Sequence, residues 1–173
     1  MLYHSTRSST QWVDSAQAVL SGLAPDGGLY MPRNIPALDW VNVLKGTSQE
    51  ISTAILESLL PDIPDMPQLV ARAYTGKFET EDLTPTVAVG DLSVLELFRG
   101  PTSAFKDVAL SMLPQLLTAA KEEKGVKEDI LILTATSGDT GKAALVGFRD
   151  VPGVKICVFY PQGGVSQVQR AQM

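Results

Sequence analysis

The stretch GPTSAFKD, residues 100–107, joins two apolar segments that have different patterns. The segment before it, residues 92–98, is a short and mostly apolar run that is typical of a strand, and Gly100-Pro101 ends this run with a turn. After the stretch, apolar residues recur at helical spacing: Val108, Ala109, Met112, Leu113, Leu116 and Leu117. The sequence therefore predicts a strand, a tight loop and a helix, with Lys106 where the loop becomes the helix.

Lys106 stands in a position that suits a chemically reactive lysine. The N-terminus of a helix carries a partial positive charge, which disfavours an ammonium group beside it. The apolar neighbour Phe105 disfavours the charged form further, because it removes water from around the amine. Both effects favour the neutral amine that forms Schiff bases with carbonyl groups. On position alone, a solvated lysine in the first turn of a helix is the more common alternative.

A second segment predicts a parallel sheet. Residues 129–135 form a buried apolar run, the turn TSGDTG follows at 136–141, a helical pattern covers 142–148, and residues 154–159 form another apolar run. This order of strand, turn, helix and strand is a βαβ unit, whose two strands run parallel. The turn places free backbone N–H groups at a helix N-terminus, where anions bind.

Other chemistries fit the sequence poorly. A nucleotide-binding P-loop ending at Gly141-Lys142 needs a glycine where Thr136 stands and a hydroxyl residue where Ala143 stands. A dinucleotide fingerprint and the G-x-S-x-G elbow of serine hydrolases are both absent from the sequence. With one histidine, His4, one cysteine, Cys157, and no spaced cluster of carboxylates, the sequence predicts no metal site.

Composition and charge limit the class of protein. The 173 residues suffice for one ordinary domain with a core. The net charge of −5 argues against nucleic acid or an anionic membrane as a partner, because both require a basic face. No apolar run approaches the ~20 residues of a membrane span, and the first fifteen residues lack the apolar core of a signal peptide. We therefore expect a soluble, cytoplasmic protein, with Cys157 buried in its strand.

The rest of the chain predicts mainly helices before residue 80. An extended opening over residues 1–9 precedes a helix over 10–21, with Thr10 as N-cap and Gly22 as C-cap, and a loop over 22–39. Thr47 and Glu50 form a capping box that opens the next helix, and residues 68–74 form a short one. Residues 86–89 and 92–95 predict a hairpin with a two-residue turn. Within the helix that follows Lys106, Pro114 predicts either a kink or an end near Leu113.

Taken together, GPTSAFKD and the turn TSGDTG some thirty residues later resemble the motifs of the threonine synthase family. The segments YHSTR, residues 3–7, and GLAPDGGLY, residues 22–30, are similar to the opening motifs of that family. The family consists of fold-type-II enzymes that depend on pyridoxal 5′-phosphate (PLP). The resemblance implies an α/β fold in which an N-terminal helical domain, residues 1–80, precedes the start of a parallel-sheet PLP domain, residues 81–173.

The resemblance also implies an active site. Lys106 would bind PLP as a Schiff base and move protons during the reaction, and Asp139 would face the cofactor ring. The substrate α-carboxylate would be held by Ser137, Gly138, Asp139, Thr140 and Gly141. The reaction would convert O-phospho-L-homoserine and water into L-threonine and phosphate, with PLP as the electron sink.

Members of the family are more than twice as long as this chain, and residues 163–173 resemble an interior segment of them. We therefore expect an N-terminal piece that alone is inactive and binds PLP weakly or not at all. The alternatives are a PLP-dependent phospho-lyase that consumes O-phosphohomoserine without making threonine, and a non-catalytic fragment that binds a protein partner. The sequence leaves a homo-oligomer open.

Overall fold

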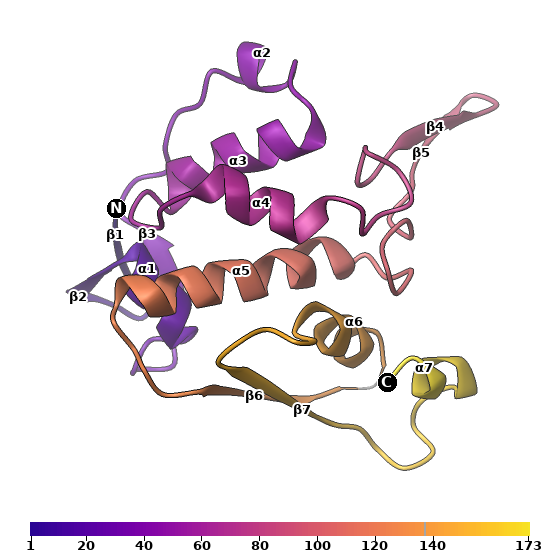
Figure 1. The fold of residues 1–173 in the computed structure, drawn as a ribbon. Helices are drawn as coiled ribbons and strands as arrows, with labels where there is room; N and C mark the ends of the chain where they lie inside the picture. The colour runs from indigo at the N-terminus through magenta and orange to yellow at the C-terminus, as the bar shows by residue number, and fades with distance from the viewer. Residues whose placement is uncertain (137) are drawn as a thin grey trace. The chain divides into compact units, whose positions relative to one another are not determined.

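The computed structural model describes residues 1–136 and 138–173 (Figure 1). The chain divides into two compact units: unit 1 contains Met1–Val70 and Leu116–Lys127, and unit 2 contains Ala71–Gln115 and Glu128–Met173. The α/β fold that the sequence predicts is confirmed, including its parallel strands. A domain boundary at residues 80 and 81 stays a prediction.

Unit 1 combines a small antiparallel sheet with short helices. The sheet has the strand order β2-β1-β3, and β1 pairs antiparallel with both neighbours. Its strands are β1 (Leu2–Ser5), β2 (Ser8–Asp14) and β3 (Tyr30–Pro32). The helices are α1 (Ser15–Ser21), α2 (Trp40–Val43), α3 (Ser48–Leu59) and the first part of α4 (Met66–Tyr74). The predicted capping box of Thr47 and Glu50 is confirmed at the start of α3.

The helix predicted over residues 10–21 is wrong in its first five residues. Residues 10–14 belong to β2, where Trp12 pairs with His4 and Val13 with Tyr3. Aromatic and β-branched side chains favour strands, and pairing with β1 outweighs the helical spacing of the same residues. The helix begins after Asp14, whose carboxylate accepts a hydrogen bond from the Gln17 amide as an N-cap, so the predicted cap at Thr10 is wrong. The predicted C-cap at Gly22 is confirmed.

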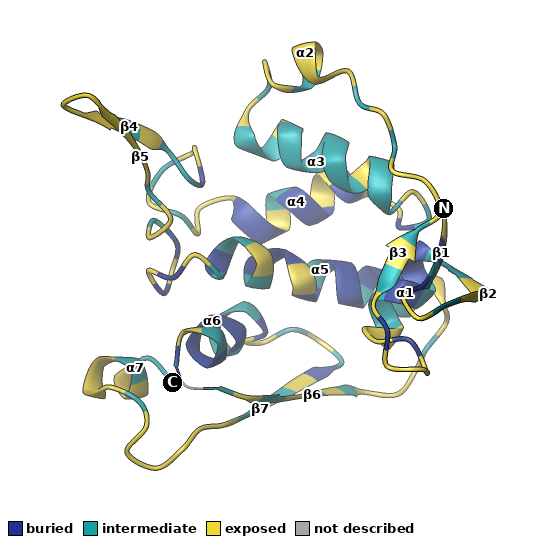
Figure 2. Cartoon of the chain, turned by 180° about the vertical axis from the view of Figure 1, so that it is seen from behind, coloured by how far each residue is buried: buried dark blue, intermediate teal, exposed yellow. Residues whose placement is uncertain are grey.

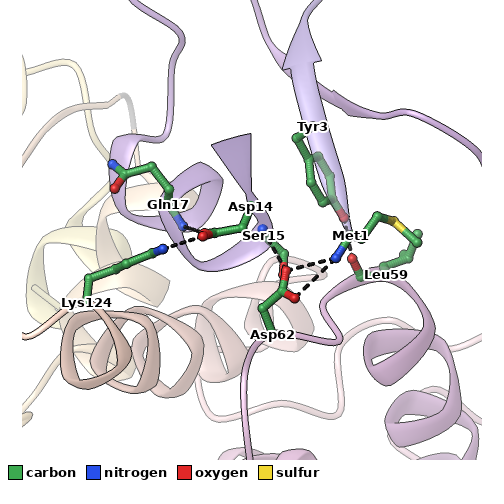
Figure 3. A network of polar contacts seen from close by, with 8 residues as sticks. All are labelled: Met1, Tyr3, Asp14, Ser15, Gln17, Leu59, Asp62 and Lys124. Carbon is green, nitrogen blue, oxygen red and sulfur yellow. Dashed lines mark hydrogen bonds and ion pairs between the residues drawn. The ribbon is translucent and has the colours of Figure 1, made fainter. Parts of the chain in front are cut away.

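A group of polar contacts stabilises unit 1 around Asp62 (Figure 3). The Asp62 carboxylate accepts hydrogen bonds from the Met1 amine at 2.9 Å and from the Ser15 amide and hydroxyl at 3.1 and 2.6 Å. Burial alone would raise the pKa of Asp62, but these hydrogen bonds outweigh it and lower the pKa below its ordinary value. The Asp14 carboxylate also binds the Lys124 amine. These contacts connect the first residues to segments far along the chain.

Unit 2 contains the hairpin and the βαβ unit. The hairpin of β4 (Thr86–Val89) and β5 (Leu92–Leu95) is antiparallel, and β6 (Ile130–Ala135) runs parallel to β7 (Val154–Phe159), so both predictions are confirmed. Helix α6 (Asp139–Gly147) connects the two parallel strands, and α7 (Gln167–Ala171) follows them. Helix α5 (Asp107–Glu123) is one continuous α-helix with Pro114 inside it. The alternative end near Leu113 is therefore wrong.

Two glycines allow α6 to approach its neighbours closely. A Cβ on Gly141 would lie 2.4 Å from the methyl group of Thr136, the residue after β6, and 2.8 Å from Val158, so this end of α6 packs directly on β7 and on the end of β6. A Cβ on Gly147 would lie 2.0 Å from the carbonyl oxygen of Leu110 in α5. Pro114 has no N–H to donate to that carbonyl four residues earlier, so the helix leaves it without its usual backbone donor. These contacts fix α6 against both the sheet and the start of α5.

The exposure of β6 and β7 alternates along each strand, as Figure 2 shows. Ile156 and Val158 are half-buried, whereas Cys157 between them is exposed, so the predicted burial of this thiol is wrong. Strands of a parallel sheet are normally covered on both faces. Here the side chains on the face that carries Cys157 are exposed. In the part of the chain that the structure describes, no helix is both long and apolar enough to cross a bilayer.

Candidate functional site

Lys106 lies at the start of α5, as the sequence predicts. Its side chain is half-buried, and its amine lies 4.6 Å from the centre of the Phe105 ring. Among the described residues, no carboxylate and no hydrogen-bond acceptor contacts this amine. The backbone carbonyl of Lys106 accepts a hydrogen bond from the Leu110 amide, so the residue is fixed to the first turn of the helix. The structure therefore holds the backbone of Lys106, and among the described residues its amine has no polar partner.

The loop before Lys106 is organised by the next residue, Asp107. Its carboxylate is 2% exposed and accepts hydrogen bonds from the Thr102 amide at 2.8 Å, the Thr102 hydroxyl at 2.6 Å and the Ala104 amide at 3.3 Å. A Cβ on Gly100 would lie 2.5 Å from the Asp107 side chain, so this position needs glycine. A buried carboxylate requires such partners. Asp107 thus clamps the loop and sets the direction in which Lys106 leaves the helix.

The Gly-rich turn begins α6. Gly138 has φ 151° and ψ −89°, a conformation that favours glycine, and its amide donates to the Thr136 hydroxyl at 3.2 Å. The first N–H groups of a helix have no acceptor within the helix, so at residues 139–141 they are available to an anion. Thr140 is half-buried and Gly141 is buried against the sheet. Ser137, the remaining residue predicted for the substrate carboxylate, lies outside the described residues.

Asp139 is the charged group of this turn. One oxygen of its carboxylate, Oδ1, accepts from the Gln169 amide group at 3.2 Å and pairs with the Lys142 amine at 3.2 Å. The hydrogen bonds from Gln169 and then from Lys142 are the main causes that lower the pKa of Asp139. Burial opposes them, and the positive charges of Lys142 and Lys106 contribute least. Lys106 and Asp139, predicted for one site, are thus near enough to interact electrostatically.

Lys142 follows the turn and is 7% exposed. In the sequence it stands where a P-loop would place its phosphate-binding lysine. In the structure its amine pairs with Asp139, one turn earlier on the same helix. A buried amine needs such a partner, so Lys142 supports the turn rather than binding a nucleotide.

The two opening motifs meet within unit 1. The Ser5 hydroxyl donates to the Asp26 carboxylate at 2.6 Å, and the guanidinium of Arg7 donates to the Asp26 carbonyl at 3.0 Å. The Gly28 amide donates to the same carboxylate at 2.9 Å. Ser5 and Asp26 also line a pocket of about 600 Å³ whose other walls come from residues 8–30. Hydrogen bonds between the two motifs thus connect residues 5–7 to residues 26–28.

The donor groups of unit 2 fit PLP better than a metal ion. A primary amine at Lys106 can bond to an aldehyde, and the start of α6 can bind the carboxylate of an amino acid. Among residues 1–136 and 138–173, no three His, Cys, Asp or Glu side chains gather closely enough to hold a metal ion. The arrangement is chemically suited to a cofactor that carries an aldehyde.

Sequence reasoning missed Asp107 and Gln169 as parts of this site. Asp107 stands in the quoted stretch, but only the fold shows that its carboxylate turns back to the loop amides. Gln169 could have been noticed through Ser166, because S-x-x-Q is the signature of a capping box. That signature predicts the helix α7. It does not predict that the Gln169 side chain reaches Asp139, thirty residues earlier in the chain.

Comparison with known proteins identifies similar sequences. A family model described as "Threonine synthase N terminus" matches residues 2–74. The chain is 38% identical over 192 residues to the threonine synthase of Saccharomyces cerevisiae, and the match covers 99% of the chain and 37% of the yeast protein. It is 37% identical over 186 residues to threonine synthase-like 2 of Mus musculus, and this match covers 100% of the chain and 37% of the mouse protein. The chain therefore spans little more than a third of the length of these curated relatives.

Solved structures agree with this similarity. The chain superimposes on the crystal structure of PLP-bound threonine synthase from Brucella melitensis with a TM-score of 0.89 and 37% identity, covering 100% of this chain and 38% of that one. For the crystal structure of threonine synthase from yeast, the TM-score is 0.87 and the identity is 38%. This match covers 99% of the present chain and 38% of the yeast chain. The similarity thus extends across both units of the chain.

Proposed function

We propose that this chain, which is similar to the N-terminal portion of threonine synthases, supplies the reactive lysine and the carboxylate-binding turn of a PLP-dependent lyase of that family. The proposed reaction converts O-phospho-L-homoserine and water into L-threonine and phosphate. One observation carries the proposal: in unit 2, the amine of Lys106 has no polar partner among the described residues, and its charge adds a minor contribution, after Gln169 and Lys142, to the lowered pKa of Asp139.

Lys106 has two tasks in this proposal. Its Nζ bonds to the aldehyde of the cofactor, which supplies an electron sink for the substrate carbon atoms when it is bound. When Nζ is free, it is the base positioned to move protons on the substrate. The Asp107 clamp keeps the lysine at one place relative to the loop, which proton transfer over hydrogen-bond distances requires.

The start of α6 orients the substrate. We assign the substrate carboxylate to the N–H groups at Asp139, Thr140 and Gly141, together with the Thr140 hydroxyl and with Ser137 and Gly138. A negative group at this end of α6 also interacts favourably with the helix dipole. Asp139 is assigned to the cofactor ring as well, because half of its side chain is exposed despite its two partners.

The test is an assay of both products in a protein that carries this sequence. We expect phosphate and threonine in equal amounts from O-phospho-L-homoserine when PLP is present. Lys106→Ala should abolish both products. Lys45→Ala is the matched control, because Lys45 is in unit 1 and its amine donates to Asn42 on the surface, and it should retain full activity. Equal activity of the Lys106→Ala variant would refute the proposal.

The same assay separates the second candidate, the phospho-lyase. The chain is also similar to proteins named threonine synthase-like 2, at 37% identity, so the family name alone does not decide the product. Release of phosphate without threonine would favour the lyase. Loss of this phosphate release in Lys106→Ala would still assign the lysine to the chemistry.

Location and assembly belong to the proposal as well. We propose a cytoplasmic enzyme that acts on a small molecule and forms a homo-oligomer. The net charge of −5 supports a partner other than nucleic acid or an anionic membrane. Exposed apolar side chains on β6 and β7, Leu131, Leu133 and Phe159, support a protein contact.

A further inference from the structure

The side chain of Gln169 joins α7 to the turn that begins α6. Its Oε1 accepts a hydrogen bond from the Ser166 amide at 3.0 Å, and its Nε2 donates to Asp139 Oδ1 at 3.2 Å. The Gln169 amide in turn donates to the Ser166 hydroxyl at 3.1 Å, which completes the capping box of α7. One carboxamide therefore closes a helix cap and binds a residue of the proposed site.

The network determines which way the carboxamide faces. A carbonyl oxygen can only accept, and the Ser166 amide can only donate, so Oε1 must be the atom that faces Ser166. The amino group must then face Asp139, whose ionised carboxylate can only accept. The hydrogen bond to Asp139 has an ionised acceptor, and at 3.2 Å it is longer than the usual length of about 2.7–2.9 Å for charge-assisted bonds.

Gly138 allows this contact to form. A Cβ at residue 138 would lie 2.4 Å from Nε2 of Gln169 and 2.6 Å from its side-chain carbonyl carbon. With any other residue at this position, the Gln169 carboxamide would have to move away from its present place. The backbone conformation of residue 138 also favours glycine.

The two oxygens of Asp139 have different surroundings. Gln169 and Lys142 both bind Oδ1, from α7 and from α6 itself. Among the described residues, nothing binds Oδ2, and the side chain of Asp139 is 50% exposed. The carboxylate is thus anchored through one oxygen, and the other is available to a ligand.

We propose that Gln169 is a positioning residue of the active site: it anchors Asp139 through Oδ1 and so directs Oδ2 toward the bound substrate and cofactor. This inference rests on the proposed function of the turn. The charged groups that act on Asp139 are Lys142 of α6 and Lys106 at the start of α5. The hydrogen bond from Gln169 is the leading cause of the lowered pKa of Asp139, which agrees with the geometry.

Two variants separate this role from the capping of α7. Gln169→Glu keeps an oxygen that accepts from the Ser166 amide, so the capping box survives, but it replaces the donor to Asp139 by a negative charge. Ser166→Ala removes the other half of the capping box and leaves the Gln169–Asp139 hydrogen bond intact. Gln169→Glu therefore changes the contact with Asp139, and Ser166→Ala changes the cap of α7, so the two variants test these features separately.

The measurement is the pH titration of the Asp139 carboxyl group by carbon-13 NMR in the chain without cofactor. We expect Gln169→Glu to move the midpoint of the Asp139 titration to higher pH, because a like charge and a lost donor both disfavour the carboxylate. Ser166→Ala should leave this midpoint where the unmodified chain has it. Unchanged midpoints in both variants, or the same displacement in both, would overturn the inference.

A second readout keeps this result separate from the proposed function. PLP is added to the same variants and the visible absorbance of the bound PLP is recorded. The Schiff base is then reduced with borohydride, and the labelled lysine is mapped. The inference is supported if Lys106 is labelled in all variants and the visible absorbance of the bound PLP is displaced in Gln169→Glu alone. Label on Lys106 with the same absorbance in all variants overturns it. Label on another lysine of the unmodified chain, with Lys106 unlabelled, refutes the proposed function, whatever the Asp139 titration shows.

Discussion

In unit 1 the Asp62 carboxylate is bound by the Met1 amine and by the amide and hydroxyl of Ser15, whereas in unit 2 the Lys106 amine lies beside a single aromatic ring. The first arrangement connects three distant parts of the chain. The second leaves a charged group without a described polar partner, although its backbone is fixed. Hydrogen-bonded charges contribute to stability, and an amine that must react with a ligand has to remain accessible.

Asp139 combines both arrangements in one side chain. Its Oδ1 is bound twice, by Gln169 and Lys142, and its Oδ2 is free among the described residues. In unit 1 the Asp62 carboxylate is thus surrounded by partners, whereas the described residues of unit 2 leave the Lys106 amine and Asp139 Oδ2 without a polar partner. The following changes test this difference.

The largest effect is expected in unit 2 from Gly147→Val. The added side chain would place its Cβ 2.0 Å from the Leu110 carbonyl, so α6 and α5 would have to separate. Overpacking of this kind costs about 3 kcal/mol of unfolding free energy. Urea denaturation measures this loss, and labelling of Lys106 by PLP should fall with it. Arg149→Ala, an exposed change two residues away, is the control, and an equally stable Gly147→Val variant would contradict the close packing.

A smaller loss of stability is expected in unit 1 from Asp62→Ala. The buried Ser15 would lose the acceptor of both its amide and its hydroxyl, which costs about 2 kcal/mol. Urea denaturation measures the loss, with the exposed Glu57→Ala on α3 as a control. Labelling of Lys106 should stay unchanged in folded protein. If Asp62→Ala abolished the labelling without unfolding the chain, the division of roles between the units would be wrong.

Asp14 should contribute less than Asp62. Its carboxylate caps α1 by accepting from the Gln17 amide and also binds the Lys124 amine. Asp14→Ala removes both contacts and should cost about 1 kcal/mol, the usual value of an N-cap. Asp14→Asn keeps an oxygen for the cap and loses only the ion pair. Its free energy of unfolding should therefore lie close to that of the unmodified chain and above that of Asp14→Ala. Equal losses in the two variants would show that the ion pair, and not the cap, stabilises this end of α1.

The smallest effect is the acid dependence of stability. The pKa of Asp14 is lowered mainly by its hydrogen bond with Lys124, and the pKa of Asp62 is lowered by its partners. A lowered pKa in the folded state gives stability that is present above the ordinary pKa and is lost as the pH falls through the lowered one. Thermal melting between about pH 5 and pH 2 should show this loss. Asp14→Asn should melt with a weaker pH dependence; an unchanged dependence would exclude this carboxylate as a source.

Local signals predicted many elements of the fold. Thr47 with Glu50 marks a helix start through contacts within one turn, and Gly90-Asp91 joins two strands that are neighbours in sequence. The parallel pair of β6 and β7 followed from the order of strand, helix and strand. In the first two cases, the residues that carry the sequence signal are also the residues that make the contact. In the third case, one short helix connects the two strands that pair.

Distant pairing explains what the sequence did not predict. Residues 10–14 follow a helical pattern, but β1 supplies strand partners that no local pattern reveals. In the candidate site, the positions of Lys106 and of the turn at 138–141 were predicted, and their roles stay predictions. The Asp107 clamp and the Gln169 contact depend on side chains that turn toward other segments, so they required the fold.

The most direct test of the account is to map which lysine of the chain PLP modifies. The chain is mixed with PLP, reduced with borohydride and digested, and the pyridoxyl peptides are identified. Lys77 is the internal competitor, because desolvation lowers its pKa and so makes its amine more reactive without any site. The account predicts that Lys106 is labelled before Lys77 and before the paired Lys124 and Lys142. Label on Lys77, Lys45 or Lys142 with Lys106 unmodified would contradict it.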